Sequence, residues 1–157
     1  MSKITPFLWF DHQAEEAVTF YTSIFKNSKI SSISRYGDAS PGLAGSVMVM
    51  EFELEGQKFA ALNGGPEYHF NPAISFYVNC ESQAEVDYYW EKLTEGGTEV
   101  QCGWLTDKYG ISWQIVPTIL GQLLSDPDPE KAARVTQAML KMIKLDIAEV
   151  KHAYQGD

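Results

Sequence analysis

A length of 157 residues, 45% of them hydrophobic and 21% charged, suits one globular domain or two small units that share a core. The formal net charge of −9 at pH 7 disfavours nucleic acid and anionic membranes as partners, because both repel an acidic surface. No apolar run approaches the roughly 20 residues that span a bilayer, and the first residues lack the hydrophobic region of a signal peptide. We therefore expect a cytoplasmic protein, in which Cys80 and Cys102 are reduced thiols that fill space.

The first half of the chain changes between a period of two residues, typical of strands, and a helical period. An opening strand at residues 7–10 is followed by a helix that ends near Phe25. The period of two then returns in three stretches, at residues 29–36, 46–54 and 58–62. The last two stretches are joined by Glu55-Gly56, which predicts a tight hairpin turn.

The second half repeats this order. An alternating strand at residues 74–78 leads into a helix that ends near Thr94, and Gln13-Ala14-Glu15 recurs there as Gln83-Ala84-Glu85, an offset of 70 residues (83 minus 13). Further strands are expected at residues 98–104 and 111–116, on either side of a hairpin-like connection. The repeat predicts an α+β fold with two tandem βαβββ modules. They would cover about residues 4–63 and 73–117, within a single domain that ends in a helical tail at residues 118–157.

Two segments rich in glycine interrupt the pattern. Residues 37–45 match neither GxxxxGK[ST] nor GxGxxG, so a surface loop is expected rather than a phosphate site. Residues 63–66 are interpreted as a hinge between the halves. In the tail, Asp128 is a suitable N-cap and Pro129 a suitable first helical residue. An apolar stripe follows, made of Ala132, Val135, Met139, Leu140, Ile143, Ile147, Val150 and Tyr154.

Several segments resemble a known protein family. Residues 14–17 (AEEA) followed by Phe20-Tyr21 resemble the opening of PhnB-like members of the vicinal-oxygen-chelate superfamily. The branch labelled 3-demethylubiquinone-9 3-methyltransferase is similar at residues 62–66, 70–76, 102–105 and 107–117. The resemblance extends over nearly the whole chain, including the tail. It implies the glyoxalase/bleomycin-resistance fold, a small-molecule cavity enclosed by curved sheets, and commonly a homodimer.

Superfamily enzymes usually hold a divalent metal through His and Glu side chains. The positions that the resemblance assigns to these ligands fall at Thr5, Ala73, Gln114 and, within one or two residues, Asn63. Neutral side chains of this kind bind Zn²⁺, Fe²⁺ or Mn²⁺ poorly. We therefore expect no metal and no other cofactor, and a divalent metal is the open alternative.

No catalytic residue can be named from the sequence. His12, His69 and His152 are expected at the surface or in packing roles, and Glu51 and Glu53 on the solvated side of a sheet. A common S-adenosylmethionine enzyme would show a glycine-rich turn after its first parallel strand and an acidic residue after the next. The chain has neither pattern, so the family label is a weak argument for methyl transfer.

Strand alternation identifies candidate ligand-binding residues. Trp9, Ser75, Tyr77 and Gln114 are expected to face inward, with Asn63 close by. Aromatic walls with a few neutral hydrogen-bonding groups suit a small organic ligand. The sequence thus predicts a metal-independent small-molecule-binding protein. Two alternatives stay open: an enzyme of the same fold (a metal-dependent lyase, isomerase or dioxygenase, or the methyltransferase of the label), and an interface protein with a vestigial cavity.

A second copy of the chain is the other expected partner. Exposed apolar strand edges are a liability that pairing about a two-fold axis removes. The strand that carries Met48, Met50 and Phe52 and the C-terminal helices are the expected contact regions. No nucleic-acid or membrane partner is expected.

Overall fold

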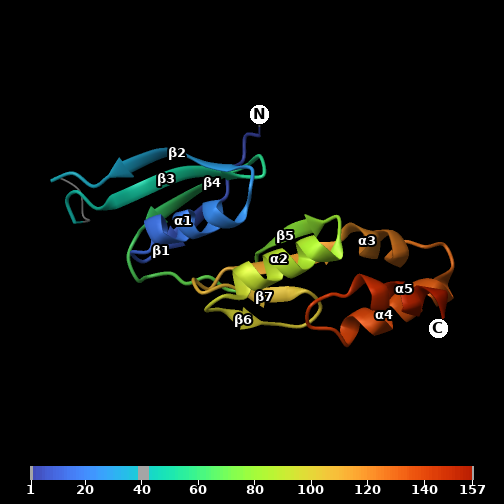
Figure 1. Cartoon of the computed structure of the whole chain (residues 1–157). Helices are drawn as coiled ribbons and strands as arrows, with labels where there is room; N and C mark the ends of the chain where they lie inside the picture. Colours follow the sequence, from blue (N-terminus) through green and yellow to red (C-terminus); the bar gives the residue numbers. More distant parts are fainter. Residues whose placement is uncertain (1, 39–42, 157) are drawn as a thin grey trace. The chain divides into compact units, whose positions relative to one another are not determined.

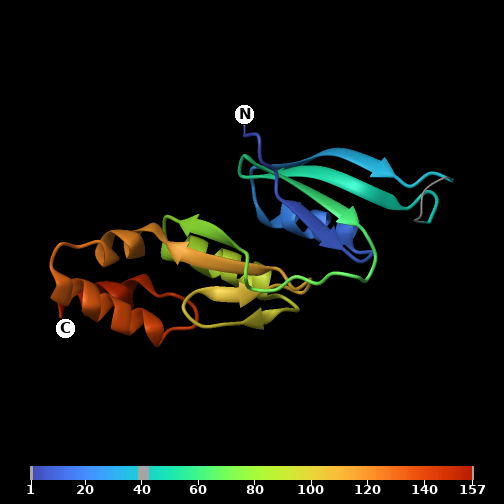
Figure 2. The same cartoon turned by 180° about the vertical axis from the view of Figure 1, so that it is seen from behind.

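The computed structural model describes residues 2–38 and 43–156, which form two compact units divided between Phe70 and Asn71 (Figures 1 and 2). Each unit contains a four-stranded mixed sheet. The element order is β-α-β-β-β in the first unit and again in the second, followed there by three helices. The predicted α+β fold with two βαβββ modules is confirmed.

The first unit is built from one sheet and one helix. Its elements are β1 (Phe7–Phe10), α1 (Ala14–Ile24), β2 (Ser28–Arg35), β3 (Val47–Leu54) and β4 (Gln57–Asn63). The sheet order is β1-β4-β3-β2, with β1 parallel to β4 and the other pairs antiparallel. The predicted loop at residues 37–45 includes residues 39–42, which lie outside the described part of the chain.

The core of the first unit lies between α1 and one face of the sheet. Met50 and Phe52 of β3 are fully buried there, so their side chains cannot form the dimer contact that the sequence suggested. The opposite face of β3 carries Val47, Val49, Glu51 and Glu53, and its Glu53 pairs with Lys29 at 3.3 Å. Glu55 and Gly56 both have positive φ, 49° and 83°, as expected for a tight turn that follows the twist of the hairpin.

The second unit repeats the arrangement. Its elements are β5 (Ser75–Cys80), α2 (Gln83–Thr94), β6 (Thr98–Glu99), β7 (Trp104–Thr106) and β8 (Ser112–Pro117), in the sheet order β5-β8-β7-β6. The single strand predicted at residues 98–104 is wrong. Cys102 and Gly103 have φ values of 60° and 83°, which turn the chain and leave two short strands, β6 and β7, in its place.

The connection before β8 is closed by a buried carboxylate. Asp107 accepts hydrogen bonds from the backbone amides of Tyr109 and Ile111, at 2.8 and 3.1 Å, and from Trp113 Nε1 at 2.9 Å. These donors compensate the cost of burying the charge. Asp107 therefore stabilises the connection before β8, and both of its carboxylate oxygens accept hydrogen bonds within the protein.

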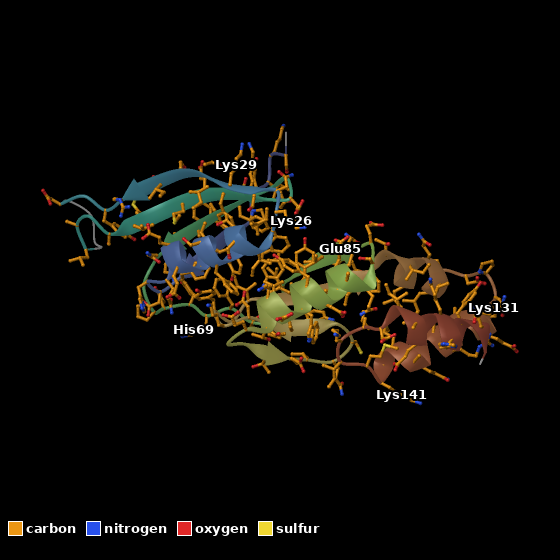
Figure 3. The ribbon with its side chains drawn as sticks, in the orientation of Figure 1. Lys26, Lys29, His69, Glu85, Lys131 and Lys141 are labelled. Carbon is orange, nitrogen blue, oxygen red and sulfur yellow. The ribbon has the colours of Figure 1, made fainter. Side chains whose placement is uncertain are left out.

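The tail forms its own helical layer in the second unit. It consists of α3 (Thr118–Leu124), α4 (Pro129–Leu140) and α5 (Ile147–Gln155), and Asp128 and Asp146 cap the last two as side-chain acceptors. In Figure 3, Lys131 lies on this layer, and its ammonium is 5.1 Å from the centre of the Tyr154 ring. Within the described residues, no helix has the length and apolar character needed to cross a bilayer.

The tail surrounds a small core that it shares with β8. The buried members of this core are Val116, Leu120, Val135, Met142, Leu145 and Val150. Leu140 and Ile143, which the sequence assigned to the same apolar stripe, are about half exposed. The helical period ends where α4 ends, at Leu140, so a stripe extrapolated across that end does not stay on one face.

Polar contacts attach the tail to α2. The Gln83 side chain donates to Leu145 O at 3.1 Å and accepts from Ile147 N at 2.8 Å. Lys144 pairs with Asp87 at 2.8 Å. Two residues of the repeated helix therefore hold the chain between α4 and α5 in place.

Candidate functional site

The predicted ligand residues divide between the two units. Trp9 and Asn63 belong to the first unit, and Ser75, Tyr77 and Gln114 belong to the second.

In the second unit, the predicted residues share the sheet face opposite α2. Tyr77 on β5 is directly opposite Gln114 on β8, and Gln114 Nε2 donates to Ser75 Oγ at 3.0 Å. Trp104 on β7 is paired with Gln114 on its other side. Because paired residues point to the same face of a sheet, an amide, two hydroxyls and an indole lie together here.

Tyr77 is the most exposed aromatic member of this set, with 52% of its surface accessible. Desolvation by partial burial raises the pKa of Tyr77 above its ordinary value. The hydroxyl therefore stays protonated at neutral pH and can both donate and accept a hydrogen bond. The face can recognise a ligand only through uncharged groups at these positions.

In the first unit, Trp9 supports the segment after β4. Its ring is so close to Gly64 that a Cβ atom on that residue would lie 2.4 Å from two ring carbons. Trp9 Nε1 donates to Gly65 O at 2.9 Å, and the Tyr68 ring meets the indole edge-on at 4.9 Å between centroids. The indole therefore packs against Gly64 and bonds to Gly65, within the segment that the sequence interpreted as a hinge.

Asn63 is directly opposite Phe10 in the sheet, on the side that faces α1. Its Oδ1 accepts from Ala14 N at 2.8 Å at the start of α1, and its Nδ2 donates to Val47 O at 3.1 Å. The amide thus fixes a helix start and a neighbouring strand, and direct contact with a ligand would compete with these bonds.

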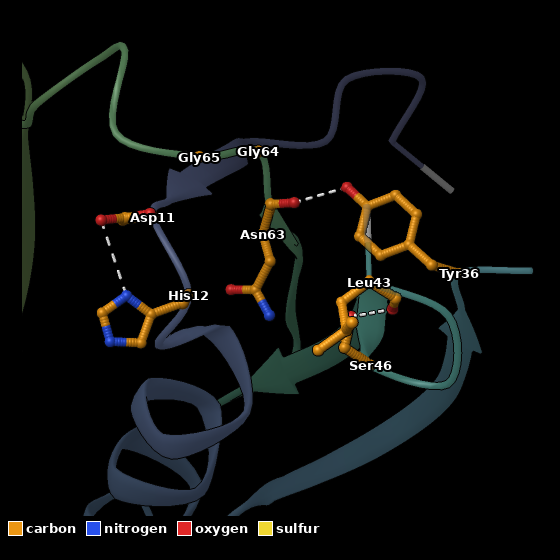
Figure 4. Close-up of a pocket in the computed structure, with 8 residues that line it drawn as sticks. All are labelled: Asp11, His12, Tyr36, Leu43, Ser46, Asn63, Gly64 and Gly65. Atoms are coloured by element: carbon orange, nitrogen blue, oxygen red, sulfur yellow. Dashed lines mark hydrogen bonds and ion pairs between the residues drawn. The ribbon is translucent and has the colours of Figure 1, made fainter. Parts of the chain in front are cut away.

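A hollow of about 370 Å³ lies beside Asn63 (Figure 4); we call it the first-unit hollow. Its lining residues are Asp11, His12, Tyr36, Leu43, Ser46, Asn63, Gly64 and Gly65. Tyr36 donates its hydroxyl proton to Asn63 O at 2.5 Å, and Ser46 donates to Leu43 O at 2.5 Å. Asp11 Oδ2 is 3.6 Å from His12 Nδ1.

Sequence reasoning missed most of this lining. Asp11 follows β1, whereas Tyr36 and Ser46 flank the loop between β2 and β3, and only strand pairing brings them together. His12 is exposed, as are His69 and His152, in agreement with their expected surface positions (Figure 3 labels His69). The available signal was the position of Asp11 and His12 directly after a strand that is parallel to its neighbour.

A smaller hollow of about 210 Å³ occupies the related place in the second unit. It is lined by Cys80, Glu81, Pro117, Thr118, Ile119, Gln122, Ile147 and Lys151. Cys80 and Pro117 are paired in the sheet as Phe10 and Asn63 are in the first unit. Burial, and next the charge of Glu85, raise the pKa of the Cys80 thiol to about 12. The thiol is therefore protonated and unreactive at neutral pH.

The positions that the resemblance assigned to metal ligands do not fit a transition metal. Thr5 and Ala73 are exposed, Gln114 donates to a serine, and both ends of the Asn63 amide bond to the backbone. In the part of the chain that the structure describes, no three or more His, Cys, Asp or Glu side chains are grouped so as to hold a metal ion.

Comparison with known proteins supports one family. The family model described as 3-demethylubiquinone-9 3-methyltransferase matches residues 2–116. A PhnB protein from Bacillus cereus, which carries the same methyltransferase name, is 42% identical, covers 74% of this chain and 100% of its own, and has a TM-score of 0.69. No curated protein matches. The tail lies outside the residues that the family model matches, so the expectation that the resemblance includes it stays a prediction.

Two more distant structures show the fold alone. Protein PA1353 from Pseudomonas aeruginosa is 22% identical, covers 74% of this chain and 98% of its own, and has a TM-score of 0.62. The fosfomycin resistance protein FosX from Listeria monocytogenes is 15% identical, covers 80% of this chain and 98% of its own, and has a TM-score of 0.58.

Proposed function

Because the chain belongs to the family described as 3-demethylubiquinone-9 3-methyltransferase, with PhnB-like relatives of the glyoxalase/bleomycin-resistance fold, we propose that it binds a small organic molecule without a metal. The observation that carries this proposal is the first-unit hollow. Its volume of about 370 Å³ is of the order of known small-molecule sites, roughly 300–1,000 Å³.

The walls of this hollow are held in place by the protein itself. Trp9 supports Gly64-Gly65, and the Tyr36 hydroxyl is bonded to Asn63 O. A preformed site loses little conformational entropy when a ligand binds. Two of the predicted residues, Trp9 and Asn63, therefore act here as supports of a ligand site.

The sheet face of the second unit supports the metal-independent part of the proposal. Gln114 has the reach of a glutamate but lacks the negative charge that would offset dehydration of a divalent ion. Its amide offers two donors and one acceptor, of which one donor bond goes to Ser75. Such a group suits a ligand carbonyl, hydroxyl or amide.

A thermal-shift screen of a small-molecule library tests the proposal, because a ligand that binds the folded state raises the Tm. The screen is run with a chelator, and again with Mn²⁺ or Zn²⁺ added. We expect ligands whose Tm shifts are the same in all conditions. Stoichiometric metal in protein purified without added metal would contradict the metal-independent function.

Two variants locate the site. Ser46→Tyr places a ring in the first-unit hollow, whereas Gln114→Ala removes the amide from the sheet face of the second unit. If the ligand contacts Gln114, that substitution should weaken binding by about 1–3 kcal/mol, since a polar ligand group would lose its partner. A ligand that neither variant weakens would contradict both placements.

A second candidate function is methyl transfer, favoured by the description of the family and by the name of the Bacillus cereus relative. An enzyme of this kind must bind its methyl donor. S-adenosylmethionine should then raise the Tm and give methylated product with a phenolic acceptor. No Tm shift at millimolar S-adenosylmethionine would remove this candidate and leave the binding function standing.

A further inference from the structure

We propose that the first-unit hollow binds small organic cations, with the carboxylate of Asp11 as the counter-charge. This inference rests on the proposed function, since it names the chemical class of ligand for the same hollow. Some polar groups of the lining are engaged with the protein, and others can still meet a ligand.

The formal charge of the hollow is negative. Asp11 lines it with 45% of its side-chain surface exposed, and none of the described lining residues is a lysine or arginine. With histidine counted as neutral, the lining therefore carries one negative charge. The net charge of −9 on the whole chain attracts cations to the surface in addition.

The two hydroxyls of the lining and its two glycine amides donate within the protein, and the exposed His12 ring is the further side-chain donor beside Asp11. The hydroxyls of Tyr36 and Ser46 both donate to backbone carbonyls, as the dashed lines in Figure 4 show. The backbone amides of Gly64 and Gly65 donate to Phe10 O and Asp11 O, at 2.8 and 3.2 Å. With their protons engaged, the Tyr36 and Ser46 hydroxyls offer a ligand oxygen lone pairs, which pair with donors such as an ammonium group.

The surroundings do not favour an anion. The first helical amide of α1, that of Ala14, is taken by Asn63 Oδ1, and Glu15 and Glu16 occupy the first turn. Arg35, the last residue of β2, pairs with Glu15 at 3.8 Å and donates to Gly45 O at 3.3 Å. The Ala14 amide and the nearby guanidinium are thus both engaged within the protein.

The Tyr36 ring adds an aromatic wall. The negative face of an aromatic ring attracts ammonium groups, with a preference for ligands that are partly desolvated. A carboxylate and a tyrosine in one hollow therefore select a cation that also has an apolar part.

Three probes of similar size and different charge test the proposal: benzylamine (a cation at pH 7), benzyl alcohol (neutral) and benzoate (an anion). Their Kd values are measured by calorimetry at pH 7, and the amide NMR signals of Gly64 and Gly65 report whether a probe enters the hollow. We expect benzylamine to bind at least about tenfold more tightly than the other two and to shift these signals, because hydrogen bonds to charged groups are the stronger ones.

Asp11→Asn removes the charge without changing the shape, and it should weaken benzylamine binding about tenfold. Asp38→Asn is the matched control: it makes the same change at an exposed residue outside the lining, and should leave the Kd nearly unchanged. Equal Kd values for all three probes, tighter benzoate binding, or equal effects of the two variants would overturn the cation proposal.

The outcomes separate this proposal from the proposed function. If the hollow binds neutral or anionic library compounds but not benzylamine, the charge argument fails and the binding function stands. If no compound of the library or of the probe set binds, both fail.

Discussion

Gly64 has no side chain, and the structure shows why none fits: the Trp9 ring occupies the space. A Cβ atom there would lie 2.4 Å from ring carbons, closer than contact allows. We therefore predict that Gly64→Ala lowers the free energy of unfolding by about 1–3 kcal/mol, as overpacking does. Urea unfolding measures this change, with a shift of the indole fluorescence as a second readout.

Gly37→Ala is the matched control in the same unit. A Cβ atom at Gly37 would meet nothing within 4 Å, and the residue has no positive φ. This variant should change the free energy of unfolding by a few tenths of a kcal/mol at most. Equal effects of the two alanines would show that the contact with Trp9 is not what excludes a side chain at Gly64.

At the scale of the residue, the sequence predicts the sheet face of a side chain better than it predicts the bonds that the side chain makes. Alternation correctly places Trp9 on the face opposite Leu8 and Phe10, which are buried. It does not show that Asn63 caps α1, because that bond joins residues 49 positions apart and depends on the pairing of β1 with β4. Whether Trp9 and Asn63 contact a ligand stays a prediction.

At the scale of the elements, the two copies of the Gln-Ala-Glu motif, at residues 13–15 and 83–85, make different contacts. Gln83 bonds to Leu145 O and Ile147 N of the tail, whereas its counterpart Gln13 accepts a bond from the adjacent His12 N. We predict that Gln83→Ala increases hydrogen exchange at Cys102 and Gly103, whose amides donate to Met142 O and Ile143 O. The loss of two hydrogen bonds should lower the free energy of the local opening that exposes these amides by about 1–3 kcal/mol.

Gln13→Ala provides the control for this prediction. It removes the same side chain from the equivalent helix start and should leave exchange at Cys102 and Gly103 unchanged. Unchanged exchange in Gln83→Ala would mean that the shared apolar core alone holds the tail in place.

The tail attachment should also depend on pH. The hydrogen bond from Lys144, and next that from Gln83, lower the pKa of Asp87 below its ordinary value. Its contribution to stability is therefore present above about pH 3.8 and is lost as the pH falls through the lowered pKa. We expect the difference in unfolding free energy between the native chain and Asp87→Asn to shrink from pH 6 to pH 3.

Lys144→Met tests the cause of this pH dependence. Without the ammonium, the carboxyl of Asp87 loses the largest contribution to its lowered pKa, so the variant should show a weaker pH dependence than the native chain. A pH dependence that is the same in both chains would assign the effect to other carboxyl groups.

Local sequence signals predicted the elements where the period was long. The ends of the helices α1 and α2, and both bounds of the strands β3 and β4, were expected within about two residues of where they lie. The strands β6 and β7 were predicted as one, because Cys102 takes a left-handed conformation that no sequence pattern required. The tail illustrates the same limit: Asp128 and Pro129 marked the start of α4, but the buried side chains that share its core come from β8, α3, α5 and the segment between α4 and α5.

For the whole molecule, the remaining expectation is a homodimer. Several apolar side chains of the described single chain are largely exposed: Ile4 at 78%, Phe7 at 57% and Ile74 at 75%. Phe7 lies on β1 and Ile74 directly precedes β5, and these are edge strands of their sheets. Exposed apolar groups at strand edges favour association, because pairing removes the apolar side chains and the unpaired strand edge from water.

We therefore propose that two chains associate through these edges, and we expect light scattering at micromolar concentration to give twice the 17.6 kDa mass of one chain. Phe7→Ser should weaken association, because it removes an exposed aromatic ring from an edge strand. Leu43→Ser is the control: Leu43 is equally apolar and 80% exposed, but lies in a loop rather than on an edge strand. A monomer mass for the native chain, or equal effects of the two serines, would contradict association through the strand edges.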